Sequence, residues 1–399
     1  MVHRVRRPWT KEPVMADAQQ NYIPGLEGVY VNESGMSSVD GANGRLYYRG
    51  YTIEDLAANC NFEHVAYLLL YNELPTRKQL ALFKDDLIRE RYLDPHLKAI
   101  IVLTPRHGHP MAVLQALVAQ LAMHDPELAD KTIEAKRRKA LRIIAKMPLV
   151  VTYFDNLRGR ERTVVRRDDL SHAANMLYML TGKVPTPEEE RIFDVALILH
   201  MDHGCNNSTF TCRVVSSTEA DIYTAVVAAL GSLSGPLHGG ANERVIEMLE
   251  SIEGLADIEP TVTEMITEGR KIPGFGHRVY KTVDPRATIL RKMAEALARD
   301  RHDDRDLVKA VRFMEVTRAK LDELGKTQIW PNVDFFSGVV YKALGLPKDM
   351  FTAVFAISRV VGWTGHHFEQ MENNRIYRPR LMWTGRQLGT AYIPLKDRG

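Results

Sequence analysis

One histidine of the sequence lies in a run of small residues that leaves room around its ring. His238 occurs in "SGPLHGGANE", and a helical pattern begins a few residues later. Glycine permits close backbone approach, and the positive end of the following helix disfavours a second proton on the imidazole. A neutral imidazole there can donate a hydrogen bond to a developing oxyanion. The alternative is a capping histidine in a tight loop, which needs no such clearance.

A second polar cluster, "PGFGHRVYKTVDPRA" at 273–287, brings His277, Arg278, Lys281, Asp284 and Arg286 close together in the chain. Arg286 follows a proline at the expected start of a helix, where the helix dipole opposes a cation. A cation at that position indicates that an anion is bound there.

A single carboxylate is enclosed by apolar residues in "WPNVDFFSG". Asp334 is preceded by Val333 and followed by two phenylalanines. A carboxyl group in apolar surroundings has a raised pKa and is poorly solvated, as a general base requires. By composition alone, Asp334 is equally well explained as the N-cap of a helix.

Two histidines end an apolar helical run in "LILHMDHGCNNSTF". His200 and His203 are three residues apart and so share a helix face, a spacing that can suit a metal ion. No third ligand follows at a familiar spacing, so structural or substrate-binding roles are favoured over metal binding. Because a helix C-terminus favours a protonated imidazole, His203 is suited to meeting an anion.

Two later arginines complete the set. Arg359 interrupts the apolar helical run "FTAVFAISRVVGW", and Arg378 lies in "RIYRPR". A guanidinium within an apolar run is unfavourable unless a carboxylate neutralises it. Together these residues fit a small dicarboxylate held by arginines, beside a site for proton removal from carbon.

Composition narrows the classes of function. The 399 residues include 53 basic and 50 acidic side chains, a balance that does not favour nucleic-acid binding. The three cysteines form no C-x-x-C pair, which fits a reducing cytoplasm. No apolar run approaches the roughly 18 residues of a membrane span.

The elements that must position these side chains are mostly helices. Two short segments, 28–34 and 44–50, are expected to pair as a small hairpin. A helical run at 52–74 begins at Thr52 as an N-cap. Helical spacing of apolar residues then recurs at 76–93, 110–123, 132–158, 169–181, 187–204, 219–233, 241–252, 285–300, 306–324 and 351–370. The fold class is therefore mainly α.

Six of these motifs resemble the citrate synthase family. "HMDHGCNNSTF", "SGPLHGGANE", "PGFGHRVYKTVDPRA", "PNVDFFSG", "ISRVVGW" and "RIYRPR" occur in the order in which that family carries them. The resemblance covers about residues 25–395 and is closest to the shorter bacterial and archaeal members. Several motifs in a fixed order are more specific than any single one.

The resemblance implies a fold, an assembly and a reaction. The fold would have a large helical domain at 25–239 and 346–399 and a smaller inserted helical domain at 240–345, which closes over the active site. Residues 1–24 lie outside the resemblance, and from their own sequence we expect them to be a disordered extension. The chain would form a cytoplasmic homodimer that condenses acetyl-CoA with oxaloacetate, a step of the tricarboxylic acid cycle, without a metal or another cofactor.

The resemblance also implies residue roles. Asp334 would take a proton from the acetyl methyl group, His238 would donate a hydrogen bond to the thioester oxygen, and His277 would polarise the oxaloacetate carbonyl. Oxaloacetate would be held by His203, Arg286 and Arg359, together with Arg378 of the partner subunit. The coenzyme A phosphates would meet Arg278, Lys281 and Lys326.

Three alternatives stay open at this point. A 2-methylcitrate synthase shares these motifs and uses propionyl-CoA, and one methylene discriminates by only about 1–3 kcal/mol in an apolar pocket. A non-catalytic helical scaffold would have no need to hold Asp334 near His238 and His277. A metal-dependent aldol-type enzyme would lose its activity on chelation.

Overall fold

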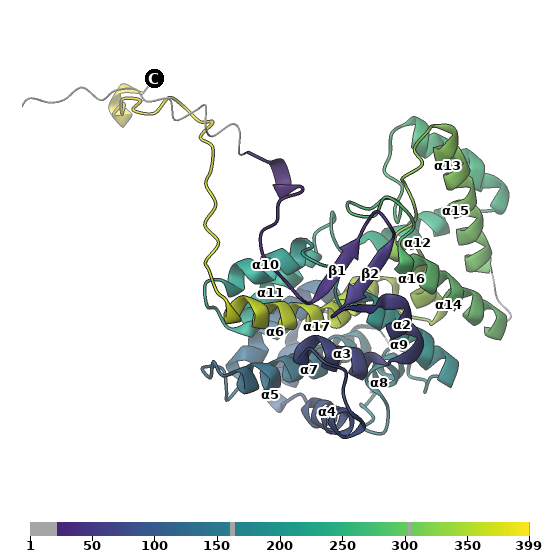
Figure 1. Ribbon diagram of the computed structural model, residues 1–399, viewed down its shortest axis with the longest axis horizontal. Helices are drawn as coiled ribbons and strands as arrows, with labels where there is room; N and C mark the ends of the chain where they lie inside the picture. The colour runs from purple at the N-terminus through teal and green to yellow at the C-terminus, as the bar shows by residue number, and fades with distance from the viewer. Residues whose placement is uncertain (1–21, 160–163, 302–304, 399) are drawn as a thin grey trace, which may run out of the picture. The chain divides into compact units, whose positions relative to one another are not determined.

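A computed structural model describes residues 22–159, 164–301 and 305–398 of the chain. Helices form most of it, as Figure 1 shows, so the mainly α fold class is confirmed. The α-helices are α2 (Ile53–Asn59), α3 (Phe62–Tyr71), α4 (Arg77–Glu90), α5 (Pro95–Leu103), α6 (Pro110–Met123), α7 (Ile133–Gly159), α8 (His172–Thr181), α9 (Pro187–His200), α10 (Asn207–Ser216), α11 (Ile222–Leu233), α12 (Ala241–Ser251), α13 (Ile258–Thr267), α14 (Pro285–Arg301), α15 (Arg305–Glu323), α16 (Val333–Ala343) and α17 (Phe351–Glu372).

A small antiparallel sheet precedes the helices. It consists of β1 (Ser37–Asp40), β2 (Arg45–Tyr48) and β3 (Tyr51–Thr52), in the order β1-β2-β3. The pairing of β1 with β2 places Ser37 opposite Tyr48. The predicted first strand at 28–34 is wrong: its alternating apolar residues have no strand beside them, and Tyr30 is 99% exposed.

Side-chain caps set several helix boundaries. Thr52 accepts a hydrogen bond from the Asp55 amide at 3.1 Å, as the predicted N-cap requires. The single helical run predicted for 52–74 is wrong, because Asn61 caps a new helix, α3, and accepts from the His64 amide at 3.1 Å. An asparagine that bonds the amide three residues ahead starts a helix more readily than it continues one.

Four observed helices fall outside the ranges that apolar spacing predicts: α5, α10, α13 and α16. The helix predicted at 187–204 ends at His200, so 201–204 form a turn instead. All four unpredicted helices are short, and the first residues of α16 follow a proline. Short helices depend more on packing than on their own periodicity, because helix nucleation is unfavourable.

The core is built around α17, which is buried along most of its length. This helix packs against α3, α7, α9, α10 and α11, and its Trp363 is fully buried. Gly362 lets α17 approach the turn after α9, since a Cβ there would lie 2.3 Å from the Met201 carbonyl oxygen. The helix with Arg359 therefore lies directly against the turn with His203.

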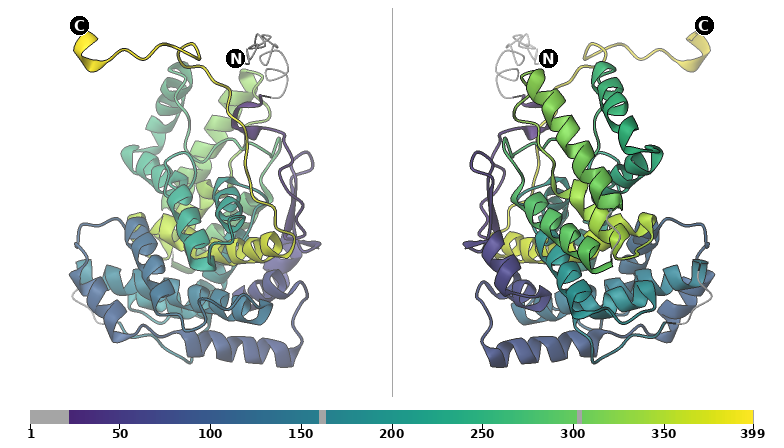
Figure 2. Two further views of the ribbon diagram at one scale, coloured as in Figure 1. Left: turned by 90° about the vertical axis from the view of Figure 1, so that its left-hand side faces the viewer. Right: turned by 90° about the vertical axis from the view of Figure 1, so that its right-hand side faces the viewer.

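Helices α12 to α16 pack largely on one another. α16 contacts α12, α14 and α15, and α13 lies beside α15. Figures 1 and 2 show α13 and α15 as a pair that extends from the rest of residues 34–376. The predicted small domain at 240–345 contains these five helices, but no observation tests its bounds, so the division stays a prediction.

The chain separates into two compact units. One is formed by residues 34–376, and the other by the segments before residue 34 and after residue 376. In the second unit, Tyr377 donates a hydrogen bond to the Val31 carbonyl at 3.4 Å. The predicted disordered extension at 1–24 lies almost wholly outside the described residues. Among the helices that are described, none is long and apolar enough to cross a membrane.

Candidate active site

His238 lies on the turn between α11 and α12, and its ring faces the start of α10. The Ser208 amide donates a hydrogen bond to His238 Nε2 at 3.1 Å, and Ser208 Oγ lies 2.8 Å from the same nitrogen. A nitrogen that accepts from an amide cannot carry a proton, so the proton of the neutral ring is on Nδ1. Burial, and then Arg359, lower the pKa of His238 to about 4. The imidazole is therefore a neutral hydrogen-bond donor at neutral pH.

The helix terminus that fixes this proton differs from the expected one. Ser208 is in the first turn of α10, whose N-cap Asn206 accepts from the Thr209 amide at 3.1 Å. The sequence pattern points to the helix after His238 instead, and Ser208 is not among the predicted site residues. The Asn-Asn-Ser run after His203 is a helix-start signal that could have indicated it.

The glycines around His238 serve the turn itself. A Cβ on Gly239 would lie 2.2 Å from the carbonyl oxygen of Leu233, the last residue of α11. Gly240 has no heavy atom within 4 Å of such a Cβ. Gly239 is therefore required because the turn folds back onto α11, whereas the space at Gly240 is open.

His277 has the opposite tautomer. The amides of Val279 and Tyr280 both donate to His277 Nδ1 at 3.0 Å, so Nε2 carries the proton of the neutral ring. Burial, and then Arg286, lower the pKa of His277 to about 4. His238 and His277 are thus both neutral, and each has one nitrogen fixed as an acceptor by one or two backbone amides.

The loop that carries His277 is paired with the segment before Asp334. The Gly276 amide donates to the Trp330 carbonyl at 2.9 Å, and the Asn332 amide donates to the Gly274 carbonyl at 2.8 Å. The Asn332 side chain also donates to the Gly276 carbonyl at 2.9 Å. Two motifs that are more than 50 residues apart in the sequence are therefore held side by side.

Asp334 is the second residue of α16. The N-cap is Asn332, whose Oδ1 accepts from the Asp334 amide at 3.0 Å, so the alternative that Asp334 is itself the N-cap is wrong. Burial raises the pKa of Asp334 to about 6, against the opposing effect of Arg286. A carboxylate with this pKa is ionised at neutral pH and is a stronger base than an exposed aspartate.

Arg286 is buried at the start of α14 and forms a two-pronged ion pair with Asp284. Arg286 Nε and Nη2 lie 3.0 and 2.8 Å from the two carboxylate oxygens. Although burial opposes the charge, Asp284 raises the pKa of Arg286. Asp284 also accepts from the Val333 amide at 3.1 Å, which links this loop to α16. The anion expected beside Arg286 is thus present within the chain, and Nη1, which has no hydrogen-bond partner among the described residues, is left for a second one.

Arg359 is buried in α17 without such a partner. Its Nε donates to the His200 carbonyl at 2.6 Å, and its guanidinium lies 4.7 Å from the centre of the Phe355 ring. Among the described residues, no carboxylate lies within ion-pair distance of it. Burial therefore lowers the pKa of Arg359 to about 10, although Asp202 acts against this shift. A buried cation in this state would gain from a bound carboxylate.

His203 lies on the turn after α9 and faces His277 and Tyr280. Its Nε2 is 3.2 Å from the Tyr280 hydroxyl, and its ring centre is 5.1 Å from that of His277. Burial, and then Arg286, lower the pKa of His203 well below its usual value. The structure thus does not support the expected protonation of His203. Burial and the nearby cations lower its pKa by more than the helix C-terminus can raise it.

A buried network that the sequence does not predict anchors the turn with His203. Ser37 donates to an Asp202 carboxylate oxygen at 2.5 Å and accepts from the Gly204 amide at 2.8 Å. Arg213 donates to His366 Nδ1 at 3.0 Å, so His366 donates from Nε2 to Asp202 at 3.2 Å. These residues come from β1, α10 and α17, so only tertiary packing assembles them.

The proposed metal pair His200 and His203 has different surroundings. His200 Nδ1 donates to the Ala196 carbonyl at 2.7 Å, and its ring packs edge-on against Phe355. Within the ranges 22–159, 164–301 and 305–398, these two histidines belong to no group of three metal-ligating side chains. His200 thus has helix and core contacts, and His203 faces the site.

The remaining predicted residues lie on the surface. Arg278 and Lys281 are exposed on the loop that carries His277, and Lys326 is exposed after α15. Arg378 is exposed in the unit formed by the chain ends, where it donates to the Pro379 carbonyl at 2.9 Å. Nothing in the structure tests their predicted contacts with coenzyme A or with a partner subunit.

The groups that the structure does bring together form one electrostatic unit. Arg286 acts on His203, His277 and Asp334, and Arg359 acts on His203, His238 and Asp334. The unit contains one carboxylate base, three neutral imidazoles and two buried cations. It can remove a proton from carbon, stabilise the oxyanion that forms and hold an anionic second substrate.

Comparisons with known proteins agree with this chemistry. A family model described as "Citrate synthase, C-terminal domain" matches residues 25–380. A citrate synthase from Acidithiobacillus ferridurans is 43% identical over 96% of this chain and 100% of its own length. A 2-methylcitrate synthase from Shewanella oneidensis is 38% identical over 93% of this chain and 97% of its own length.

The fold has a counterpart among solved structures. A ternary complex of carboxymethyl coenzyme A and oxaloacetate with citrate synthase from Thermoplasma acidophilum has a TM-score of 0.88. That protein is 33% identical to this one, and the match covers 94% of this chain and 98% of the other. The relatives thus match nearly the whole length of the chain.

Proposed function

The chain belongs to the citrate synthase family of enzymes, and we propose that it condenses acetyl-CoA with oxaloacetate and water to give citrate and coenzyme A. One observation carries this proposal. Asp334, with its raised pKa, is close enough to Arg286 and Arg359 for both to act on it, and Arg359 has no carboxylate partner among the described residues. A base beside an unneutralised buried cation suits carbon-acid chemistry with an anionic second substrate.

The first step is enolisation of the thioester. Asp334 takes a proton from the methyl carbon, and the electron pair of that C–H bond moves to form the enolate of the thioester. His238 donates from Nδ1 to the thioester oxygen as negative charge develops there. Because the pKa of His238 is about 4, the ring is a neutral imidazole at neutral pH and stabilises this oxygen with a hydrogen bond and no formal charge.

The second step forms the carbon–carbon bond. The enolate carbon attacks the ketone carbon of oxaloacetate, and His277 polarises the ketone oxygen from its protonated Nε2. The new alkoxide takes the proton of His277 Nε2 to give citryl-CoA, and the proton that Asp334 removed from the methyl group returns His277 to the neutral ring. Water then attacks the thioester carbonyl, and coenzyme A leaves as the thiol.

Oxaloacetate is held by the cationic side of the site. We place its carboxylates against Arg359 and the free edge of Arg286, with His203 as a neutral hydrogen-bonding partner. Arg378 of the partner subunit would complete this set in a homodimer. Arg278, Lys281 and Lys326 would meet the coenzyme A phosphates, in agreement with their exposure, and closure of 240–345 would shield the reaction from water.

The main alternative is that the enzyme uses propionyl-CoA, with its larger acyl group, and makes 2-methylcitrate. The 2-methylcitrate synthase among the relatives is nearly as similar as the citrate synthases, and one methylene changes the barrier by only about 1–3 kcal/mol. We therefore expect acetyl-CoA to be preferred, with measurable turnover of propionyl-CoA. A metal or further cofactor has no part in the proposed steps, and cytoplasmic location stays a prediction from the cysteine pattern.

Thiol release tests the proposal directly. Acetyl-CoA and propionyl-CoA are each assayed with and without oxaloacetate, before and after chelator treatment. We expect oxaloacetate-dependent release, a higher kcat/KM with acetyl-CoA and no loss on chelation. A higher kcat/KM with propionyl-CoA would favour the 2-methylcitrate reaction, loss on chelation would favour a metal-dependent aldol reaction, and no release with either would favour the scaffold.

A further inference from the structure

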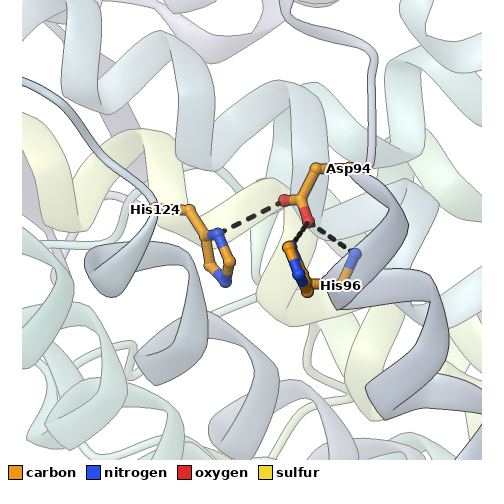
Figure 3. Close-up of side chains that lie close together, drawn as sticks. All are labelled: Asp94, His96 and His124. Atoms are coloured by element: carbon orange, nitrogen blue, oxygen red, sulfur yellow. Dashed lines mark hydrogen bonds and ion pairs between the residues drawn. The ribbon is translucent and has the colours of Figure 1, made fainter.

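Three metal-ligating side chains meet at the start of α5 and the end of α6, in a part of the fold that the reaction does not use (Figure 3). We propose that Asp94, His96 and His124 bind one divalent transition-metal ion of the Zn²⁺ type. Their ligand atoms lie within 4.8 Å of one another. Each residue comes from a helix end, so the ion would join α5 to α6.

Helix capping fixes the carboxylate. Asp94 is the N-cap of α5, and its Oδ1 accepts from the amides of His96 and Leu97 at 2.9 and 3.0 Å. This leaves Oδ2 as the oxygen that faces His124, whose Nδ1 is 3.7 Å away. His124 is the C-cap of α6, with its backbone amide bonded to Leu121. The Asp94 carboxylate and the backbone of His124 are therefore held by helix ends before any ion binds.

The distances are close to those of a bound ion. Zinc lies about 2.0–2.2 Å from nitrogen and carboxylate oxygen, so two ligand atoms on one ion are at most about 4.3 Å apart. His124 Nδ1 lies 3.7 Å from Asp94 Oδ2, within this limit, and His96 Nδ1 lies 3.9 Å from the other oxygen, Oδ1, so His96 must turn toward Oδ2. The largest separation among the three ligand atoms, up to 4.8 Å, closes when the His96 side chain rotates, which its 86% exposure allows.

The ligand types decide which metals fit. Two imidazoles and one carboxylate suit zinc, nickel or copper, whereas magnesium and calcium prefer oxygen ligands. Exposure of His96 and partial exposure of His124 leave positions for water on the ion. An open set of this kind predicts weaker binding than a closed structural zinc site.

Nearby positive charge is largely neutralised by other partners. Lys146 of α7 is close enough for Asp94 to act on its pKa. Its Nζ donates to the carbonyls of Glu90 and Tyr92 and lies 3.5 Å from the Glu90 carboxylate. Arg142, also of α7, pairs with Glu90 and Asp125. These contacts occupy both cations, so Asp94 keeps an oxygen for the ion.

Zinc titration of the chelator-treated full chain tests the site. We compare the wild type with Asp94→Asn and His124→Ala by calorimetry and by thermal unfolding with and without ZnCl₂. Asn keeps a good N-cap but removes the carboxylate charge. His107→Ala is the matched control, because His107 is an exposed histidine of the same α5–α6 connection outside the cluster.

We expect one zinc ion per chain and a zinc-dependent rise in Tm, since a ligand that binds the folded state stabilises it. Asp94→Asn and His124→Ala should each weaken binding at least about tenfold, without change in thiol release, and His107→Ala should bind as the wild type. Equal zinc affinity in all four proteins would overturn the proposal, as would wild-type binding no tighter than millimolar. Because thiol release is measured separately, failure of this site leaves the proposed reaction untouched.

Discussion

The two buried arginines of the site, Arg286 and Arg359, are held in opposite ways. Arg286 is at the start of α14 and is paired through two nitrogens with Asp284, which raises its pKa. Arg359 is in the middle of α17, where it bonds the His200 carbonyl and burial lowers its pKa to about 10. One cation is neutralised by the chain, and the other is not.

Because of this difference, we expect the two arginines to contribute differently to folding and to ligand binding. The Asp284 carboxylate also bonds the Val333 amide, so the pair that neutralises Arg286 ties its loop to the helix with Asp334. Arg359 has no such structural ion pair among the described residues, and the charge of a bound carboxylate would act on it in full. We therefore expect Arg286 to serve folding as well as binding, and Arg359 to serve binding.

The largest expected effect is at Asp334, the carboxyl group on which both arginines act. Asp334→Asn removes the base but keeps the size of the side chain, so kcat should fall about 10²–10⁴-fold. Oxaloacetate affinity, measured by equilibrium titration, should stay within a few-fold, because Asp334 is not one of the cations. A normal kcat in this variant would place the base elsewhere.

The next effect tests the paired arginine. Asp284→Asn keeps a capping side chain but leaves Arg286 buried without a counter-charge, so the free energy of unfolding should fall by about 3–5 kcal/mol. Denaturant titration measures this change. Asp86→Asn is the control, because Asp86 pairs with Arg89 on the surface, and such pairs contribute about 0–1 kcal/mol. If Asp284→Asn and Asp86→Asn lowered the free energy of unfolding equally, Arg286 would have no special structural role, and the contrast with Arg359 would be wrong.

A smaller effect tests the unpaired arginine. Arg359→Lys keeps the charge but cannot form two parallel hydrogen bonds with a carboxylate. Hydrogen bonds to charged groups contribute about 1.5–3 kcal/mol, so oxaloacetate should bind roughly 10–150-fold more weakly. The free energy of unfolding should change less than in Asp284→Asn, since no ion pair of the chain is lost. Unchanged oxaloacetate affinity would exclude Arg359 from the binding site.

The smallest effect is a pH dependence. Asp334 must be ionised to accept a proton, and its pKa is about 6, so kcat/KM should fall as the pH drops through 6 and be about half its plateau there. His238 and His277, with pKa values of about 4, stay neutral over this range. A pH profile with its acid midpoint near 4 would mean that the pKa of Asp334 is not raised, because the arginines cancel the effect of burial.

Local signals in the sequence predicted much of the helical framework. Thr186 caps α9 and accepts from the Glu189 amide at 3.2 Å, within a few residues of where apolar spacing places that helix. Such caps involve neighbours in the chain, so the sequence alone reveals them. The strand expected at 28–34 was predicted wrongly and the short helix α16 was not predicted, because each depends on what packs against it.

The sequence by itself determined which side chains we propose for the chemistry. Asp334, His238, His277, Arg286 and Arg359 are recognisable from residue type and immediate surroundings, and so is the raised pKa of Asp334. These properties depend on a few adjacent residues, or on motifs that the family carries in a fixed order.

Only the tertiary structure decided which protonation state and which partner each of these groups has. Ser208 is 30 residues from His238, yet its amide fixes the proton on the imidazole. His203 is neutral because burial and Arg286 outweigh the helix end. Arg359 is unpaired because no carboxylate among the described residues comes close to it. Desolvation and Coulomb interactions depend on distances through space, which sequence separation does not give.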